Sequence, residues 1–176
     1  MFGNLYPCAY AKDVFSIDYR KLYDHGYRGI LFDVDNTLVH HNDDSTPEVE
    51  ELFEHLKELG FQTVLISNNS KERLERFVRN MDTPFLHEAK KPAPQGYETA
   101  LSMMNVSKEK AVMIGDQMFM DVRGANRAGI DSIMVHFVVR DPKAPIGVRR
   151  YLEKLILFFY RFAFSRHKLD FAIIKR

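Results

Sequence analysis

The segment 30–38, Ile-Leu-Phe-Asp-Val-Asp-Asn-Thr-Leu, limits the folds open to this chain more than any other. A short apolar run of the kind that forms a buried strand ends in two carboxylates, Asp33 and Asp35, which an apolar core cannot hold unpaired. In open α/β sheets, ligands bind beyond the carboxyl ends of the parallel strands, so Asp33 is expected at a ligand site. Two neighbouring carboxylates repel each other unless they share a divalent cation or one of them keeps its proton.

Downstream of this segment, apolar runs alternate with amphipathic stretches, which predicts an α/β fold with a doubly wound, Rossmann-like parallel sheet. In the helix expected at 71–80, four basic residues fit a solvated face: Lys71, Arg73, Arg76 and Arg79. The expected strands span 28–33, 61–66, 83–87, 111–115 and 130–136, and the main expected helices span 47–59, 71–80, 95–104 and 121–128.

The 176 residues fit one catalytic domain by size, with three expected segments. Residues 1–27 are a lead-in packed on the core, residues 28–140 form the core, and residues 141–176 form a basic amphipathic helix and tail. A net charge of +1 gives no global argument for a polyanionic partner. The single cysteine, Cys8, excludes an internal disulfide, and no signal peptide is evident, so we expect a cytoplasmic protein.

Further polar residues follow the later apolar runs. Ser67 comes directly after the second expected strand, a Lys-Lys-Pro turn at 90–92 follows the third, and Asp116 ends the fourth, with Asp121 soon after it. By itself, the Asp-Val-Asp sequence could simply begin a turn or a helix. Polar groups that recur at strand ends in this order instead indicate one composite site.

In that order, D-x-D-x-T, Ser, Lys-Pro and G-D-x-x-x-x-D resemble the four motifs of the haloacid dehalogenase (HAD) superfamily of phosphatases. Residues 16–136 are similar to a narrower group, the class IIIA phosphatases of the YqeG type, through D-x-D-N-T-L, Lys-Lys-Pro, G-D-Q and G-x-N-R-x-G. Relatives in that group include phosphatidylglycerophosphate phosphatases, which implies a phospholipid head-group monophosphate as substrate. Met120 departs from the pattern, because the family commonly has a small hydroxyl residue there.

The resemblance implies catalysis through an aspartyl-phosphate. Asp33 would be the nucleophile, and Asp35 would be the general acid and base, with a raised pKa that lets it hold a proton. Mg²⁺ would be bound by Asp33, the Asp35 backbone carbonyl and Asp116, with Asp121 supporting the cluster.

Other residues would bind the phosphoryl group. In the resemblance, Ser67 donates to the phosphoryl oxygens, and Lys91, with Lys90 as the alternative lysine, neutralises the charge that they develop. Substrate-binding roles are also implied for Asn36, Asn68 and Lys90.

Spacing between the motifs leaves no room for the cap domain that many HAD enzymes carry, so a capless enzyme with an open site is expected. An open site suits a substrate that brings its own bulk: a membrane lipid, a nucleic-acid end, a protein, or a partner subunit that serves as a lid.

The C-terminal segment from about residue 147 combines an apolar helical face with basic residues. It is too short and too charged to span a bilayer, but it fits peripheral contact with an anionic membrane. Packing on the sheet or in a dimer is the alternative. Its apolar residues are Val148, Tyr151, Leu152, Leu155, Ile156, Phe158, Phe159, Phe162 and Ala163, and its basic residues are Arg149, Arg150, Lys154, Arg161, Arg166 and Lys168.

Three other interpretations stay open. A phospho-acceptor signalling domain also uses clustered carboxylates, a hydroxyl and a lysine, although the D-x-D-x-T spacing argues against it. A HAD phosphatase of nucleotides or polynucleotides would use the basic tail for nucleic acid, which we regard as the weaker assignment. A protein with a surviving site could also serve mainly to bind a partner, and the oligomeric state is left open.

Overall fold

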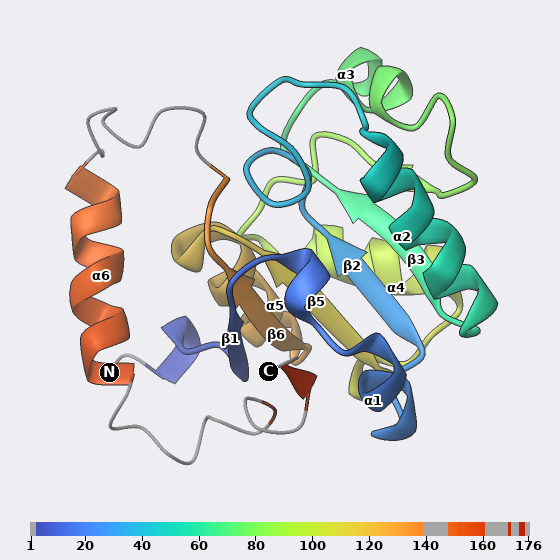
Figure 1. Ribbon diagram of the computed structural model, residues 1–176. Helices are drawn as coiled ribbons and strands as arrows, with labels where there is room; N and C mark the ends of the chain where they lie inside the picture. The colour runs from blue at the N-terminus through green and yellow to red at the C-terminus, as the bar shows by residue number, and fades with distance from the viewer. Residues whose placement is uncertain (1–2, 139–147, 161–168, 170–172, 175–176) are drawn as a thin grey trace.

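The structure is a computed structural model that describes residues 3–138, 148–160, 169 and 173–174. Its centre is a six-stranded sheet in which every neighbouring pair is parallel, with strand order β1-β6-β5-β2-β3-β4 (Figure 1). This confirms the predicted α/β class and doubly wound sheet. The strands are β1 (Ala9–Ala11), β2 (Gly29–Phe32), β3 (Gln62–Ile66), β4 (Phe85–Leu86), β5 (Ala111–Gly115) and β6 (Asp131–Val135).

Helices flank this sheet on both faces. The α-helices are α1 (Tyr19–Asp24), α2 (Pro47–Glu58), α3 (Lys71–Phe77), α4 (Pro94–Met104), α5 (Arg123–Ala128) and α6 (Val148–Tyr160). The shorter turns are the 3₁₀ segments η1 (Gly3–Leu5), η2 (Val14–Ser16) and η3 (Lys108–Lys110) and the π-helical segment η4 (Met118–Val122).

The hydrophobic core has two layers, one on each face of the sheet, and this explains why β2 is an uninterrupted apolar run. Ile30 and Phe32 belong to the cluster that α1, α2 and α3 cover, whereas Leu31 belongs to the cluster that α4 and α5 cover. Successive strand residues face opposite sides of a sheet, so a strand covered on both faces needs apolar side chains at every position. Parallel pairing of β2 with β3 and with β5 brings the carboxyl ends of these three strands together at one edge.

β1 was not predicted from the sequence, because three residues are too few to show a pattern. It pairs with β6, with Ala9 opposite Ile133 and Ala11 opposite Val135, and forms one edge of the sheet. The expected lead-in, residues 1–27, therefore contributes a strand as well as packing. Prediction also overextended the third strand, since only Phe85–Leu86 pair.

The described residues near the C-terminus pack in the main core, whereas α6 is largely exposed on one side. Leu169 and Ile173 are buried in the main core, and the Ile173 carbonyl accepts the Asp18 N–H at 2.6 Å. The end of the expected tail is therefore part of the core. The predicted tail residues Arg161, Phe162, Ala163, Arg166 and Lys168 lie outside the described residues.

Among the described residues, α6 packs against the rest of the protein by one side. Ile156 and Leu157 rest on a small cluster formed by Met118, Val122 and Met134, so α6 touches the π-helical segment η4. On its outer side, five large apolar residues are each more than half exposed: Tyr151, Leu152, Leu155, Phe158 and Phe159. In the parts of the chain that the structure describes, no helix is long and apolar enough to cross a bilayer.

Candidate active site

Asp33 emerges where the β2 ladder ends. Its backbone N–H donates to the Ile114 carbonyl of β5 at 3.0 Å, so the ladder fixes its backbone at the carboxyl edge of the sheet. The chain then turns sharply, with the Leu38 N–H donating to the Val34 carbonyl at 2.9 Å and Asn36 in the left-handed region at φ 65°. Asparagine tolerates that region better than most residues, which suits it to this turn.

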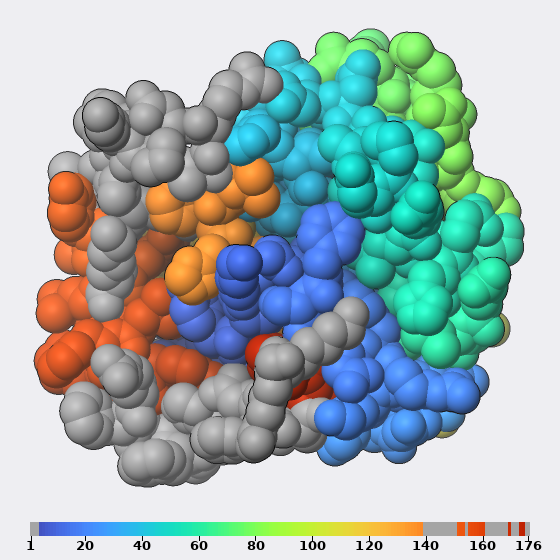
Figure 2. Space-filling view, in the orientation of Figure 1, coloured from blue at the N-terminus to red at the C-terminus, as the bar shows by residue number. Residues whose placement is uncertain are grey.

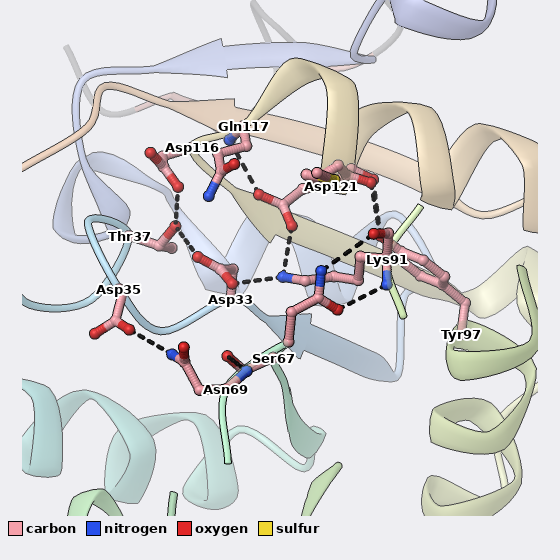
Figure 3. Close-up of polar contacts among 12 residues, drawn as sticks. Asp33, Asp35, Thr37, Ser67, Asn69, Lys91, Tyr97, Asp116, Gln117 and Asp121 are labelled. Carbon is pink, nitrogen blue, oxygen red and sulfur yellow. Dashed lines mark hydrogen bonds and ion pairs between the residues drawn. The ribbon is translucent and has the colours of Figure 1, made fainter. Parts of the chain in front are cut away.

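Lys91 is the buried cation of the site. Its Nζ donates to Asp33 Oδ1 and, at 2.7 Å, to Asp121 Oδ1 (Figure 3). Burial lowers the pKa of Lys91, but the carboxylates of Asp121 and Asp33 outweigh burial and hold that pKa above its ordinary value, so the side chain is an ammonium. Lys90 is exposed, so the structure brings Lys91 to the carboxylates and leaves Lys90 outside.

Asn68 fixes this lysine through its backbone. The Asn68 side chain accepts the Lys91 N–H at 2.7 Å and donates to the Lys91 carbonyl at 3.1 Å. Its amide group therefore holds the two motif loops together, and the substrate-binding role expected for Asn68 stays a prediction. Ser67 is buried, and its Oγ accepts the Asn69 N–H at 3.2 Å.

Asp116 and Asp121 reach the site from the end of β5. Asp116 follows the strand directly, whereas Asp121 lies in the π-helical segment η4, a distortion often found at functional sites. The Gln117 N–H donates to Asp121 Oδ2 at 3.0 Å. A Cβ on Gly115 would lie 2.5 Å from the Asp121 carboxylate, so the glycine of the Gly-Asp motif gives this carboxylate its space.

Thr37 links the two sides of the site. Its Oγ1 lies 3.1 Å from Asp33 Oδ2 and 3.2 Å from Asp116 Oδ1, as Figure 3 shows. A hydroxyl has one proton, so it donates to one carboxylate at a time. Tyr97 of α4 supports the opposite side by donating to the Met120 carbonyl at 3.0 Å. The sequence analysis gave neither side chain a role, although Thr37 is the Thr of D-x-D-x-T.

Three carboxylates converge on one point. Asp33, Asp116 and Asp121 each offer an oxygen, and these oxygens all lie within 4.8 Å of one another in buried surroundings. Burial raises the pKa of Asp33 to about 6; Lys91 opposes this shift and Asp121 adds to it. An all-oxygen donor set with excess negative charge fits a hard divalent cation such as Mg²⁺.

The Asp35 side chain stands outside that cluster. Its Oδ1 accepts the Asn42 N–H and an Arg73 Nη2–H, both at 2.9 Å, and its Oδ2 accepts from Asn69 Nδ2 (Figure 3 shows the Asn69 contact). Burial raises the pKa of Asp35, but these hydrogen bonds together outweigh it and leave the pKa below its ordinary value. The expected raised pKa of Asp35 is therefore wrong for this arrangement, because the sequence gave no sign of three donors around the carboxylate.

Arg73 corrects a second expectation. Lys71 and Arg79 are exposed, as the solvated-face interpretation of α3 expected, but Arg73 is buried with only 8% exposure. Helical periodicity places Arg73 next to Leu74 on the inner side of the helix. Its ion pair with Asp35, which the sequence did not indicate, offsets part of the cost of burying the guanidinium. Neither Arg73 nor Asn69 was predicted as a site residue.

A cavity of about 240 Å³ opens over this arrangement. Its lining includes the predicted residues Asn36, Ser67 and Asn68, and Lys90 is not part of it. Within residues 36–90, all of which the structure describes, only loops, α2, β3, α3 and β4 separate the motifs, so the fold is capless. The lining residues are Asp33, Asp35, Asn36, His41, Ser67, Asn68, Asn69, Lys91, Gln117 and Met120.

The sequence matches the family model of the haloacid dehalogenase-like hydrolases over residues 41–129. That range holds Ser67, Lys91, Asp116 and Asp121 and begins beyond Asp33. The chain belongs to the haloacid dehalogenase-like hydrolases and is a phosphatase of that family. A particularly similar relative is the Probable phosphatase YqeG of Bacillus subtilis (strain 168), 36% identical over 152 residues that cover 86% of this chain and 88% of the relative.

Other relatives are similar over shorter stretches. The glyceraldehyde 3-phosphate phosphatase of Methanopyrus kandleri is 30% identical over 98 residues, which cover 51% of this chain and 42% of that protein. Among solved structures, the 4-nitrophenylphosphatase of Thermotoga maritima superposes with a TM-score of 0.57 at 16% identity, covering 70% of this chain and 90% of that chain. NagD from Escherichia coli K-12 gives a TM-score of 0.55 at 14% identity, covering 69% and 94%. The structural likenesses show the fold.

Proposed function

We propose that this phosphatase is a Mg²⁺-dependent phosphomonoester hydrolase that works through an aspartyl-phosphate on Asp33. The observation that carries the proposal is the group of three buried carboxylates, Asp33, Asp116 and Asp121, with the single Lys91 ammonium paired to two of them. Asp33 and Lys91 line the cavity, and this excess of buried acids beside it favours a cation and an anionic substrate.

In this proposal, each polar group has a separate task. Asp33 attacks phosphorus, while the Lys91 ammonium and the Ser67 hydroxyl bind the phosphoryl oxygens that gain charge. Asp33, Asp116 and Asp121 would hold the Mg²⁺, which lowers the charge repulsion between the nucleophile and the phosphate. The Thr37 hydroxyl and the Gln117 N–H keep the carboxylates oriented before the substrate arrives.

Asp35 would act as the general acid and then as the general base. It lines the same cavity as Asp33, so a leaving oxygen can approach it. Its present hydrogen bonds stabilise the ionised form, which is the form that activates the hydrolytic water. Protonation for the first step would have to follow substrate binding, when a phosphate adds negative charge to the cavity.

For the substrate, we propose a bulky phosphomonoester with a phospholipid head group, of which phosphatidylglycerophosphate is the candidate. An uncapped cavity leaves room for a large leaving group. The outer side of α6 also supports a membrane-bound substrate, and Figure 2 shows α6 in orange at the left edge of the molecular surface. Glu153, the acidic residue of α6, is buried, so the exposed outer side offers no carboxylate to repel an anionic bilayer.

Metal removal tests the catalytic part of the proposal. After treatment with a chelator and gel filtration, the protein should not hydrolyse 4-nitrophenyl phosphate, and added Mg²⁺ should restore activity. The matched variant Asp116→Asn should need more Mg²⁺ for half-maximal activity, because it removes one carboxylate of the cluster. Full activity in the presence of excess chelator would contradict the metal dependence.

A further inference from the structure

Arg73 is the central donor in the hydrogen-bond network around Asp35. A single atom, Arg73 Nη2, donates to Asp35 Oδ1 at 2.9 Å and to the Asp43 carbonyl at 2.6 Å. The loop that holds Asp43 returns to the same carboxylate, since the Asn42 N–H also donates to Asp35 Oδ1. The guanidinium therefore joins three parts of the chain: α3, the loop after the nucleophile turn, and the carboxylate itself.

Stability alone explains this arginine poorly. Its side chain is 7% exposed, and its Nε and Nη1 groups have no hydrogen-bond partner among the described residues. Burying a guanidinium costs free energy, and each unsatisfied donor adds to that cost. Buried ion pairs can often be replaced by apolar residues with little loss of stability, so stability alone does not account for this pair.

We propose that Arg73 is a positioning residue for the reaction, which sets the direction in which the Asp35 carboxylate faces. This inference rests on the proposed function, in which Asp35 exchanges a proton with the leaving oxygen. Asp35 lines the cavity, whereas Arg73 does not, so Arg73 can act on the reaction only indirectly, through Asp35 or through the loop that holds Asp43. Without the guanidinium, Asp35 keeps the Asn42 and Asn69 donors and the His41 ring 3.5 Å away, but its Oδ1 loses the Arg73 contact and keeps only the Asn42 N–H.

A neighbouring arginine supplies a matched control. Arg76, one turn further along α3, donates from Nη2 to the Asn42 carbonyl at 2.8 Å and pairs with Asp44 at 2.6 Å. It braces the same loop, but no contact joins it to Asp35 in the described structure. The substitutions Arg73→Gln and Arg76→Gln therefore separate the loss of loop support from the loss of the contact with the carboxylate.

The experiment compares two substrates with Mg²⁺ present: 4-nitrophenyl phosphate, which has a good leaving group, and glycerol phosphate, which needs its leaving oxygen protonated. Arg73→Gln should lower kcat for glycerol phosphate about 10²-fold and kcat for 4-nitrophenyl phosphate much less, with little change in either KM. Arg73→Lys should recover part of the loss, because one ammonium can still reach a carboxylate. Arg76→Gln should leave the ratio of the two kcat values at its wild-type level.

A double variant shows whether Arg73 acts through Asp35. In the Asp35→Asn background, Arg73→Gln should cause no further loss of kcat, because the group that it positions is already gone. A double variant whose loss of kcat is the product of the two single losses would overturn the inference. Equal losses of kcat on both substrates in Arg73→Gln would also overturn it, as would the same altered ratio of kcat values in Arg76→Gln. Thermal melting identifies a variant that does not fold, and Arg73→Lys then gives the deciding ratio: an unchanged ratio overturns the inference. A wild-type protein that hydrolyses neither substrate would instead refute the proposed function itself.

Discussion

The carboxyl edge of the sheet and the outer side of α6 break the usual distribution of residues in opposite ways. At the edge, four carboxylates and two cations are buried: Asp33, Asp35, Asp116, Asp121, Arg73 and Lys91. On α6, five large apolar side chains are exposed. Buried charge and gathered apolar exposure are the informative departures in a folded protein, since a scattered exposed leucine is ordinary. We infer that the edge carries buried charge because catalysis needs it there, and that α6 exposes apolar side chains because a membrane surface covers them.

The edge itself divides into two halves that share one turn of chain. Asp33 lies with Lys91, Thr37 and two further carboxylates, so its surroundings are too negative for one ammonium to balance. Asp35 meets only donors. The carboxylates around Asp33 can therefore bind a further cation, whereas the Asp35 carboxylate already has hydrogen-bond donors on both oxygens. Each of the following substitutions removes one element of this contrast.

The largest effect is expected at Asp33. Asp33→Asn should reduce turnover of 4-nitrophenyl phosphate by about 10⁴-fold or more, because an amide cannot form the acyl phosphate. The melting temperature should stay similar or rise, since Lys91 keeps Asp121 as a partner and one buried negative charge is removed. Kinetics and calorimetry on the same preparation check both parts. Substantial activity in a homogeneous Asp33→Asn sample would remove Asp33 as the nucleophile.

Asp35 should show a loss that depends on the leaving group. Asp35→Asn should reduce turnover of glycerol phosphate by about 10²- to 10⁴-fold and turnover of 4-nitrophenyl phosphate by a smaller factor, because only the poor leaving group needs protonation. The variant should also melt at a lower temperature, since it leaves the Arg73 charge buried without its acid. Equal losses on both substrates would reduce Asp35 to a structural partner of Arg73.

Sequence reasoning named the charged residues of the first half of the edge, but in the second half it named Asp35 without the donors around it. Asp33, Ser67, Lys91 and Asp116 each follow a strand directly or sit beside a proline, so local pattern and topology were enough to bring them together. The donors around Asp35 come from a polar loop and from α3, where helical periodicity places Arg73 on the inner side but nothing in the sequence identifies its partner. Contacts that form only when a loop folds back onto the site cannot be predicted from local sequence patterns. The short edge strand β1 was also missed, because its three residues are too few to show a pattern.

The outer side of α6 should have an effect of intermediate size. Because Leu169 and Ile173 are buried in the core, removal of the whole C-terminal segment would disturb folding, and point substitutions are the better test. Phe158→Ser with Phe159→Ser should reduce sedimentation with anionic phospholipid vesicles about tenfold, and should lower turnover of phosphatidylglycerophosphate in those vesicles more than turnover of 4-nitrophenyl phosphate.

A control for that experiment uses a large apolar residue exposed elsewhere. Met103 on α4 is 43% exposed, and Met103→Ser, which removes apolar surface from a different helix, should leave vesicle binding intact. Unchanged vesicle binding in the α6 variant would contradict the proposed membrane contact. A preference for nucleotide over lipid phosphates in parallel assays would contradict the proposed lipid substrate. Neither outcome would affect the catalytic assignment.

The smallest effect, and the one that probes the two halves of the edge directly, is the pH dependence of stability in the metal-free protein. Burial raises the pKa of Asp33 to about 6 from an ordinary value of 3.8, so between these values the folded state binds more protons than the unfolded state, and stability falls as pH rises through that window. The pKa of Asp35 is lowered by its donors, so Asp35 contributes stability above its ordinary pKa and loses it as pH falls through the folded-state value.

Melting curves with a chelator present, from pH 3.5 to 7 at about half-unit steps, should therefore separate the two carboxylates. Relative to the wild type, Asp33→Asn should remove part of the decline in melting temperature between about pH 4 and 6, whereas Asp35→Asn should flatten the loss below about pH 4. Added Mg²⁺ should abolish the Asp33 contribution, because a bound cation favours the ionised form in the folded state. A wild-type decline between pH 4 and 6 that persists undiminished in Asp33→Asn would show that the excess negative charge is not centred on Asp33.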